Sequence, residues 1–375
     1  MKIVVDTRIL QKEALEEYNY FLCEVLKRIV RKYSEHEFIF VFDRPYNTEF
    51  LFNKNITAVV IGPRASNPLL WKLWYDLKIP ALLRKHNADL FVSTDGICSL
   101  TAKTPQCIIV HDLPFLYSPS FIKKTELFFY KRYFKKFLQK ANNIITVSGF
   151  LKNIISEKYA VKEEKLAVVH SAVKEIFSPL SENEKDGIKN KYTGGKNYFI
   201  YAGDIHPKKN LINLLKAFSG FKKRQKSNWK LVLLGKLDKN YKSFGESIKT
   251  YKYRDEVIIL TGQLEEKEKA NLLGSAYAFI YPPVKEGFGL AVPEAINCQV
   301  PVITSPGSAM QEIAGDAALY ADPNDHKDIA DKMMLLYKDE SLRNSLVQKG
   351  KLIAAQYSWD KAADLFWQSI LKARK

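Results

Sequence analysis

Short apolar runs alternate with helical patterns along this chain of 375 residues, and that alternation restricts its fold more than any other feature. Helical periodicity is clear in residues 18–33, 68–84 and 121–139. The predicted strands are residues 1–6, 38–42, 57–61, 90–93, 106–111, 143–147, 165–170, 198–202, 230–234, 256–261, 278–281 and 300–304. Strands that alternate with helices in this way are typical of a parallel sheet wrapped by helices.

A polar stretch at residues 177–186 interrupts the alternation, which restarts at residue 198. The chain is long enough for two domains of ordinary size, and its hydrophobic content of 46% suits a large core. We therefore predict an α/β protein with two Rossmann-like lobes that face a cleft. The predicted parts are a first lobe at 1–175, a linker at 176–196, a second lobe at 197–357 and a final helix at 358–375.

Glu286 and Glu294 bracket the segment that carries the most chemical information. Gly287 and Gly289 follow the first acid, and glycine lets a backbone turn tightly and bring its amides close to a ligand. Pro293 suits the first position of a helix, which would put Glu294 in the first turn. Carboxylates bind sugar hydroxyls and helix-start amides bind anionic oxygens, so the segment predicts a site for a phosphorylated polyol. The alternative is a glycine-rich turn before a capped helix.

The flanks of this segment carry a family resemblance. An apolar strand at 278–281 ends in Pro282 and Pro283, and a short helix and a buried strand follow at 295–304. Here the chain resembles the retaining glycosyltransferases of family 4, whose signature is two glutamates separated by seven residues after a strand. The resemblance continues through residues 312–318, 322–323 and 357–359, and covers nearly the whole chain in the family's order. It implies a GT-B fold, transfer of a sugar, and a last helix that crosses back to the first lobe.

A second motif is the loop that joins the strand at 198–202 to the helix at 211–218. It contains Gly203, Lys208 and Lys209. A departing diphosphate needs positive charge, and a lysine beside helix-end amides supplies it without a metal. Consistently, the sequence holds no D-x-D triplet. Lys209 matches the family's phosphate-binding lysine, whereas Asp204 stands where the family often has arginine, so Lys208 is the candidate for the second phosphate cation. The alternative is a connecting loop with solvated lysines.

His111 ends the strand at 106–111, at the carboxyl end where ligands usually bind in such sheets. A lone histidine after a strand is more often a structural hydrogen-bonding group. The resemblance instead implies that His111 faces the donor sugar and the acceptor. Ser148 also matches a family position and suits a helix cap.

The resemblance implies a donor site in the second lobe. Glu286 would orient the sugar hydroxyls, Glu294 would bind the ribose, and His111 and Lys209 would complete the catalytic set. No enzymic nucleophile can be identified, and retention of the anomeric configuration follows from the family alone. The implied substrate-binding residues are Gly203, Lys208, Gln263, Leu264, Gly287, Phe288, Gly289, Leu290 and Glu294.

Two further departures from the family pattern concern its glycines. The first loop of such chains usually holds glycines, but residues 7–17 contain none, and Arg8 is a candidate to take part there. Gln299 stands where glycine normally ends the helix after Glu294. If Gln299 is left-handed, it costs roughly 1–2 kcal/mol.

The formal net charge of +17 points toward nucleic acid, anionic membrane or phosphorylated substrates. We find no nucleic-acid fingerprint. The densest basic stretch is residues 123–137, in which Leu127, Tyr130, Phe134 and Phe137 recur at helical spacing. It is either a core helix with solvated lysines or a surface for anionic lipid, and the two can coexist. Family resemblance favours the second, because many such enzymes use lipid-linked acceptors.

Four scattered cysteines without C-x-x-C spacing fit a reducing cytosol. No apolar run approaches the ~18 residues that span a bilayer, and a strand begins at once, without a signal peptide. We expect a cytoplasmic protein, peripheral at the inner membrane face, that uses a GDP- or UDP-linked sugar and no cofactor or metal. GDP-mannose is the first choice of donor, and the acceptor is a saccharide or a lipid-linked saccharide.

Two alternatives stay open from sequence. A nucleotide-sugar epimerase has similar paired lobes, but its characteristic patterns are not found. A non-catalytic basic protein for nucleic acid or membrane would not need Glu286, Glu294 and Lys209 in these positions.

Overall fold

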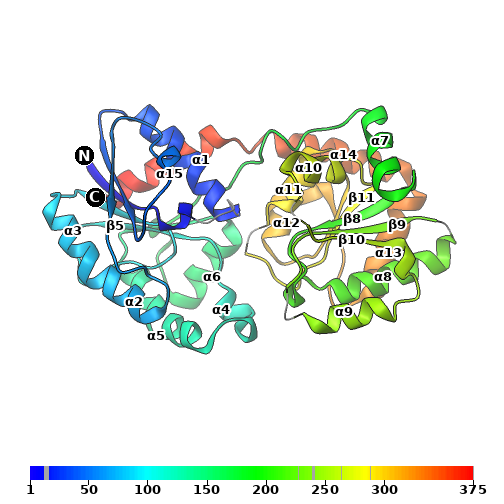
Figure 1. Cartoon of the computed structure of the whole chain (residues 1–375), viewed down its shortest axis with the longest axis horizontal. Helices are drawn as coiled ribbons and strands as arrows, with labels where there is room; N and C mark the ends of the chain where they lie inside the picture. The colour runs from blue at the N-terminus through cyan, green and yellow to red at the C-terminus, as the bar shows by residue number, and fades with distance from the viewer. Residues whose placement is uncertain (12–16, 227, 239–240, 263, 288, 375) are drawn as a thin grey trace. The chain divides into compact units, whose positions relative to one another are not determined.

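The computed structural model describes the chain except for residues 12–16, 227, 239–240, 263, 288 and 375. It divides into two compact units (Figure 1). Unit 1 contains residues 1–172 together with 357–375, and unit 2 contains residues 173–356. The predicted linker at 176–196 contains a helix, α7 (Glu182–Thr193), which begins with a capping box formed by Ser181 and Glu184.

Unit 1 is built on a parallel seven-stranded sheet in the order β3-β2-β1-β4-β5-β6-β7. Its strands are β1 (Lys2–Asp6), β2 (Glu37–Phe42), β3 (Ile56–Val60), β4 (Leu90–Ser93), β5 (Gln106–Val110), β6 (Asn143–Thr146) and β7 (Leu166–Val168). Its helical segments are η1 (Arg8–Gln11), α1 (Glu17–Lys32), η2 (Thr48–Phe50), α2 (Pro68–Leu73), the π-helix η3 (Trp74–Lys78), α3 (Ile79–Lys85), α4 (Pro114–Tyr117), η4 (Pro119–Phe121), α5 (Lys124–Lys140), α6 (Gly149–Tyr159), η5 (Glu163–Lys165) and α15 (Trp359–Arg374). Strands β4, β5 and β6 are buried throughout, which explains their continuous apolar runs.

The last helix, α15, packs against α1 and completes the core of unit 1. The ring of Trp367 stacks on Tyr33 with centroids 4.1 Å apart, and Phe366 is fully buried. Lys32 and Asp364 form an ion pair of 2.5 Å at the rim. Burial of these aromatic rings supplies the contact area that holds the C-terminal helix on unit 1.

Unit 2 is built on a parallel six-stranded sheet in the order β10-β9-β8-β11-β12-β13. Its strands are β8 (Tyr198–Ala202), β9 (Lys230–Leu234), β10 (Val257–Leu260), β11 (Ala278–Tyr281), β12 (Val302–Thr304) and β13 (Ala318–Tyr320). Besides α7, its helical segments are η6 (Pro207–Lys209), α8 (Leu211–Gln225), α9 (Lys242–Lys249), η7 (Arg254–Glu256), α10 (Glu266–Gly274), α11 (Ala291–Asn297), α12 (Ala309–Ala314), η8 (Gly315–Ala317), α13 (His326–Lys338) and α14 (Glu340–Ala354).

Each sheet has one point where the strand order reverses. In unit 1 the chain runs from β1 outward through β2 to β3 and then continues on the other side of β1 with β4. In unit 2 it runs from β8 through β9 to β10 and then continues on the other side of β8 with β11. Such a switch point leaves a crevice at the carboxyl ends of the two diverging strands, which is the usual ligand site of an open parallel sheet.

The structure confirms the predicted α/β fold and each predicted strand, with boundaries that differ by at most two residues. The sequence analysis did not predict strand β13. The predicted helix at 68–84 is interrupted by the π-turn at Trp74–Lys78, where the Ile79 amide donates to the Trp74 carbonyl. Pro80 lies at the start of α3 and lacks an amide donor, which favours such an interruption.

Candidate active site

The switch point of unit 2 brings two predicted residues into contact. Lys209 Nζ lies 2.6 Å from Glu286 Oε2 and 2.6 Å from the hydroxyl of Tyr281. That hydroxyl lies 3.1 Å from the same carboxylate oxygen. Lys209 follows β8 and Glu286 follows β11, so the strand order closes a separation of 77 residues. The cation, the carboxylate and the hydroxyl therefore meet where a ligand is expected.

This ion pair is buried. Only 12% of the Lys209 side chain and 6% of the Glu286 side chain are exposed. Removing a charge from water costs several kcal/mol, and the mutual attraction of a buried pair often does no more than offset that cost. The pair is thus weak evidence for stability. Its position at the switch point gives it a better explanation as a binding group.

The loop after β8 is held against the loop after β9 by an unusually close backbone contact. Gly203 and Gly235 directly follow these strands with φ values of 144° and 150°. A Cβ atom on Gly235 would lie 1.9 Å from the Gly203 carbonyl oxygen, so only glycine fits. The Ile205 amide donates to the Lys236 carbonyl at 2.9 Å, which fixes the start of the lysine loop.

His206 organises the lysine loop and was missed by the sequence analysis. Its Nδ1 accepts a hydrogen bond from the Lys208 backbone amide at 3.2 Å, and its Nε2 lies 3.3 Å from Asp238 Oδ2. Burial lowers the pKa of His206, and Lys208 lowers it further, against the opposing effect of Asp238. The Lys208 ammonium makes no hydrogen bond or ion pair with any described residue. The Asp204 side chain is exposed, and Lys208 remains the candidate for the second phosphate cation.

Asn210 is a second residue that sequence reasoning missed. It adopts a left-handed φ of 65° at the start of α8. Its side-chain amide donates to the carbonyls of Pro282 at 3.0 Å and Pro323 at 2.6 Å. Asn210 thereby ties the lysine loop to the loop that leads from β11 to Glu286. An asparagine directly before a helix was the available signal, because asparagine tolerates this conformation.

The loop between the two glutamates is tightly packed. A Cβ atom on Gly289 would lie 3.1 Å from the Met310 sulfur, so this position has little room for a side chain. Leu290 is buried and precedes α11, and Glu294 lies half-buried in the first turn of that helix. The prediction that Pro293 begins the helix is wrong, because α11 begins two residues earlier, at Ala291. Pro293 is tolerated there since first-turn amides have no intrahelical acceptor.

Three further predicted donor-site residues lie elsewhere or outside the described part. Gln263 and Phe288 belong to the residues that the structure does not describe. Leu264 is half-buried and follows β10, which lies two strands away from β8 in the sheet. Gly287 is buried directly after Glu286. Gln299 does have a left-handed φ of 59°.

His111 lies at the carboxyl end of β5 in unit 1. Its Nε2 lies 3.0 Å from the Thr94 carbonyl, and its ring packs against those of Tyr18 and Phe21. Burial lowers the pKa of His111 to about 4, so the imidazole is neutral at physiological pH. It can therefore donate or accept one hydrogen bond at each nitrogen but supplies no positive charge.

Two other residues singled out from the sequence also lie in unit 1. Ser148 caps α6 by accepting a hydrogen bond from the Leu151 amide at 3.2 Å, as predicted for a helix cap. Arg8 lies two residues after β1, with 10% of its side chain exposed, and forms a bidentate ion pair with Asp6. It is the centre of a polar network whose full extent the sequence did not reveal.

The basic helix predicted at 123–137 is α5. Its buried face consists of Phe129, Phe134, Phe137 and Leu138. Leu127 and Tyr130, which were predicted to lie in the core, are only half-buried. Phe129 is buried instead, so the buried face of the helix is shifted toward Phe129. Its exposed cations are Lys123 just before it and Lys124, Lys131, Arg132, Lys135, Lys136 and Lys140 within it.

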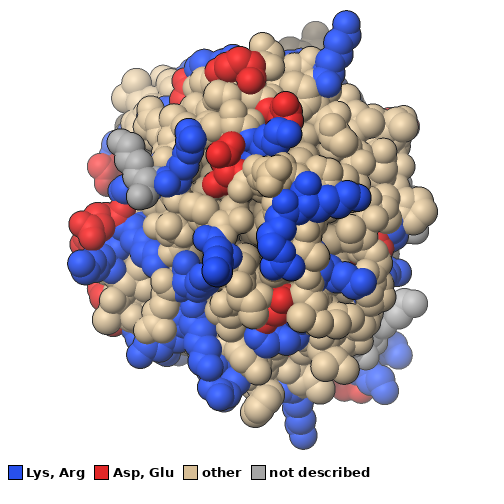
Figure 2. Space-filling model, turned by 90° about the vertical axis from the view of Figure 1, so that its left-hand side faces the viewer, with Lys and Arg blue, Asp and Glu red and all other residues tan. Residues whose placement is uncertain are grey.

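Exposed apolar side chains accompany these cations. Phe128 on α5 is 70% exposed and Leu69 on α2 is 79% exposed. The two helices are neighbours, since the rings of Trp71 and Phe129 lie 5.3 Å apart. Figure 2 shows unit 1 from the side of α3, and basic side chains predominate there over acidic ones, most clearly in the lower half. Among the described residues, no helix combines the length and the apolar character needed to cross a bilayer.

Two family models match this chain. The model of group 1 glycosyl transferases matches residues 182–353 in unit 2. The model of glycosyltransferase family 4 matches residues 19–175, almost all in unit 1. The chain is a glycosyltransferase. This match disfavours both the epimerase and the non-catalytic basic protein.

Relatives of this glycosyltransferase agree with that assignment. O-antigen chain mannosyltransferase B of Escherichia coli is 28% identical over 255 residues, which are 67% of this chain and 66% of that protein. O-antigen chain mannosyltransferase RfbU of Salmonella typhimurium is 29% identical over 275 residues, 73% of this chain and 72% of that protein. The matched region thus spans about two thirds of the length of the first relative.

The overall structure is similar to that of Anabaena Alr3699/HepE, solved in complex with UDP-glucose. The TM-score is 0.76 at 15% sequence identity, and the match covers 99% of both chains. At this identity the likeness shows the fold, which is GT-B, and nothing finer.

Proposed function

We propose that this enzyme transfers a hexose, with mannose as the first choice, from a nucleotide-diphospho-sugar to a saccharide or lipid-linked saccharide in surface polysaccharide synthesis. Transfer proceeds with retention of the anomeric configuration. The mannosyltransferase names of its relatives support GDP-mannose as donor. The UDP-glucose complex of its structural neighbour keeps UDP-hexoses as the alternative.

The observation that carries this proposal is the contact of Lys209, Glu286 and Tyr281 at the switch point of unit 2. When the glycosidic bond of the donor breaks, negative charge grows on the departing diphosphate. In this proposal Lys209 neutralises that charge, together with Lys208 and the loop amides near Gly203. A fixed cation in a site with little water stabilises developing charge far better than it would in bulk water.

Glu286 has a different role. Its carboxylate accepts hydrogen bonds from the hydroxyls of the donor sugar and holds the ring while the bond breaks. Glu294, in the first turn of α11, binds the ribose hydroxyls. Positioning of this kind accounts for a large part of enzymic acceleration, and it requires no metal in this proposal.

The test compares two variants of the buried pair with a matched control. Lys209→Ala and Glu286→Gln should each lower kcat/KM for the sugar nucleotide by about 100-fold or more. Lys191→Ala is the control, because Lys191 forms a 2.5 Å ion pair with Glu268 on the exposed surface of unit 2. It should leave turnover unchanged. Near-normal turnover by either site variant contradicts the assignment.

Donor identity and stereochemistry need separate measurements. A thermal-shift screen with GDP- and UDP-sugars should show stabilisation by one sugar nucleotide above all others, with GDP-mannose expected. The anomeric configuration of the product, read by NMR, should equal that of the donor. Inverted product would overturn the retaining mechanism, while stabilisation by no sugar nucleotide would overturn the proposal as a whole.

The enzyme works at the inner face of the cell membrane in this proposal, through the exposed cations of α5 and the apolar side chains beside them. Basic residues near an anionic bilayer each contribute about 1 kcal/mol, and exposed aromatic rings insert at the interface. Phe128→Ser should weaken sedimentation with phosphatidylglycerol vesicles. Leu352→Ser is the matched control, because Leu352 is 72% exposed but lies in unit 2. Equal losses from the two variants would contradict this surface.

A further inference from the structure

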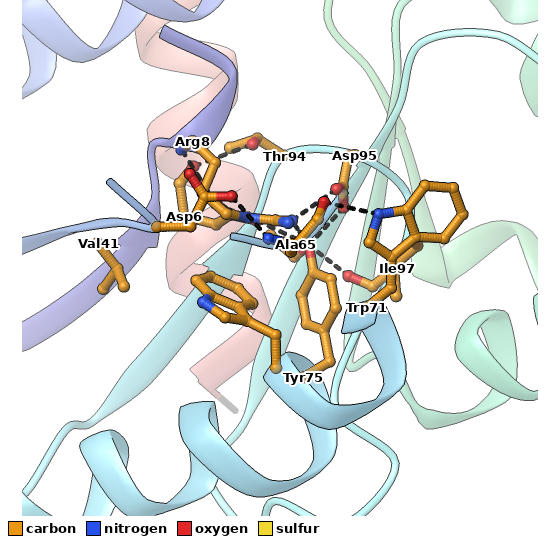
Figure 3. Close-up of polar contacts among 12 residues, drawn as sticks. Asp6, Arg8, Val41, Ala65, Trp71, Tyr75, Thr94, Asp95 and Ile97 are labelled. Atoms are coloured by element: carbon orange, nitrogen blue, oxygen red, sulfur yellow. Dashed lines mark hydrogen bonds and ion pairs between the residues drawn. The ribbon is translucent and has the colours of Figure 1, made fainter. Parts of the chain in front are cut away.

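A second charged cluster lies at the switch point of unit 1 (Figure 3). Arg8 follows β1, and its guanidinium donates to Asp6 at 2.9 Å and 2.8 Å and to Asp95 at 2.8 Å. The hydroxyl of Tyr75 lies 2.5 Å from Asp95 Oδ1 and 2.7 Å from both Asp6 Oδ2 and Arg8 Nη2. Asp95 follows β4, so residues 87 positions apart meet at the two diverging strands.

The charges of this cluster do not balance. Two carboxylates surround one guanidinium, and the Arg8 and Asp6 side chains are only 10% and 1% exposed. Arg8 also stacks over the ring of Trp74 at 4.1 Å. A buried ionic cluster is often less stable than an apolar cluster of the same volume. An excess of negative charge at a ligand-binding edge therefore calls for a functional explanation.

Asp95 is the member of the cluster that a ligand can reach. About a third of its side chain, 34%, is exposed, whereas Asp6 is covered. Figure 3 shows Trp71 on the same side of the cluster as Asp95. Trp71 is half-buried, and its indole nitrogen donates to the Ala65 carbonyl at 2.9 Å. A carboxylate that is one third exposed can accept hydrogen bonds from the hydroxyl groups of a polyol.

An unsatisfied polar atom lies beside the cluster. Thr94 joins the two, because its hydroxyl donates to the Asp6 carbonyl at 2.9 Å and its own carbonyl contacts His111 Nε2. His111 is 8% exposed, and its Nδ1 has no hydrogen-bond partner among the described residues. Buried polar atoms rarely lack a partner, so a water molecule or a ligand hydroxyl is expected to supply one here.

We propose that Asp95 binds a hydroxyl group of the acceptor saccharide at the switch point of unit 1, and that Arg8 is the positioning residue that holds it. The recognised part of the acceptor is a neutral sugar, not a phosphate or a uronate, because the exposed carboxylate and the excess negative charge repel an anion. This inference rests on the proposed function and names the substrate class of the same enzyme.

The experiment measures acceptor binding separately from donor binding. Methyl glycosides of mannose, glucose and galactose serve as neutral probes for the full-length protein by saturation-transfer NMR, with the corresponding sugar phosphates as anionic probes. At least one neutral glycoside should bind, and the sugar phosphates should bind weakly or not at all. Asp95→Asn should weaken binding of the neutral probe by about tenfold, as loss of a charged hydrogen-bond acceptor does.

Asp89→Asn is the matched control, because the Asp89 side chain is similarly exposed, at 37%, but lies far from the proposed site. Asp89 directly precedes β4, at the amino end of that strand, whereas Asp95 follows its carboxyl end. It should leave probe binding unchanged. Unchanged binding by Asp95→Asn, equal binding of sugar phosphates, or no binding of any neutral glycoside would overturn the inference. In those cases stabilisation of the same protein by a sugar nucleotide would leave the proposed function standing, and its absence would remove both.

The role of Arg8 is tested by pH. Asp95 faces Arg8, Asp6 and Tyr75. Burial raises the pKa of Asp95, and Arg8 opposes that rise by favouring the ionised form. In Arg8→Met the carboxyl group should stay protonated to a higher pH, so the pH midpoint of probe binding should rise by about one unit. Arg8→Lys should not restore the wild-type profile, because a single ammonium cannot bridge two carboxylates as the planar guanidinium does. An unshifted midpoint in Arg8→Met would show that Arg8 does not act through Asp95.

Discussion

The switch points of the two sheets carry similar sets of side chains, but the net charges of these sets differ. In unit 2 a lysine after the first strand meets a glutamate after the fourth, with Tyr281 between them, and in unit 1 an arginine meets Asp95 with Tyr75 between them. The pair in unit 2 is balanced and has Lys208 beside it, which suits a diphosphate. The cluster in unit 1 has one carboxylate in excess, which suits neutral hydroxyls. In the two proposals, one topology thus serves two kinds of ligand through a few side chains at strand ends.

The backbone at the two points differs as well. Gly203 and Gly235 directly follow β8 and β9, whereas Thr7 and Phe42 occupy the positions that correspond to them by register in unit 1. The same ladder hydrogen bond is present in both, from Gly203 to Leu234 at 2.9 Å and from Thr7 to Val41 at 3.0 Å. The paired glycines and the close backbone approach that they allow distinguish this point of unit 2, and in the proposed function they leave backbone amides accessible to phosphate.

The largest effect is expected from removing the central cation of unit 1. Arg8→Met leaves Asp6 and Asp95 without a countercharge, and it should lower the free energy of unfolding by about 5 kcal/mol at neutral pH. Lys209→Met should cost less, because Glu286 then keeps its hydrogen bond from Tyr281 and has no second carboxylate beside it. Urea denaturation of both variants measures the difference. A larger loss for Lys209→Met would contradict the charge comparison.

Asp95→Asn sharpens the same comparison. Burial raises the pKa of Asp95 above its ordinary value, so the fold disfavours its ionised form. We expect the amide to leave the free energy of unfolding unchanged or slightly increased, although acceptor binding falls. A clear loss of stability would mean that the carboxylate serves the fold.

The backbone contact of unit 2 gives the next effect. Gly235→Ala introduces a Cβ atom 1.9 Å from the Gly203 oxygen and strains a φ of 150°, and together these should cost about 4 kcal/mol. Displacement of the lysine loop should also abolish stabilisation by the sugar nucleotide. Gly245→Ala in α9 is the control, because its new methyl group meets open space. Thermal unfolding with and without the donor distinguishes the two.

The lowered pKa of His111 predicts that the stability of the fold depends on pH. Its pKa is about 4 in the fold and 6.5 ordinarily, so between these values the unfolded chain binds a proton that the folded chain does not. The neutral ring makes its full contribution to the free energy of unfolding above pH 6.5. This contribution falls by about 3 kcal/mol as the pH decreases to 4. His111→Gln should flatten this slope in urea denaturation at several pH values. His206→Gln should change it less, since His206 is only half-buried.

The sequence predicted the elements because buried parallel strands are continuous apolar runs, which can be read without knowing their neighbours. It also placed Glu286 and Lys209 at strand ends. It could not show that Arg8 meets Asp95, since that contact depends on β4 lying next to β1. His206 and Tyr281 were missed for the same reason: their partners, Asp238 and Lys209, lie in segments that follow neighbouring strands.

The smallest effect is expected from a substitution at Gln299, which lies in unit 2. It has a φ of 59° between α11 and β12, a conformation that glycine adopts without strain. Gln299→Gly should raise the free energy of unfolding by about 1 kcal/mol and leave activity unchanged, because no contact of the active-site groups involves this side chain. Gln311→Gly inside α12 is the control and should destabilise by a similar amount. If Gln299→Gly also destabilises, contacts of the glutamine side chain outweigh the backbone strain, and the departure from the family's glycine is compensated by packing.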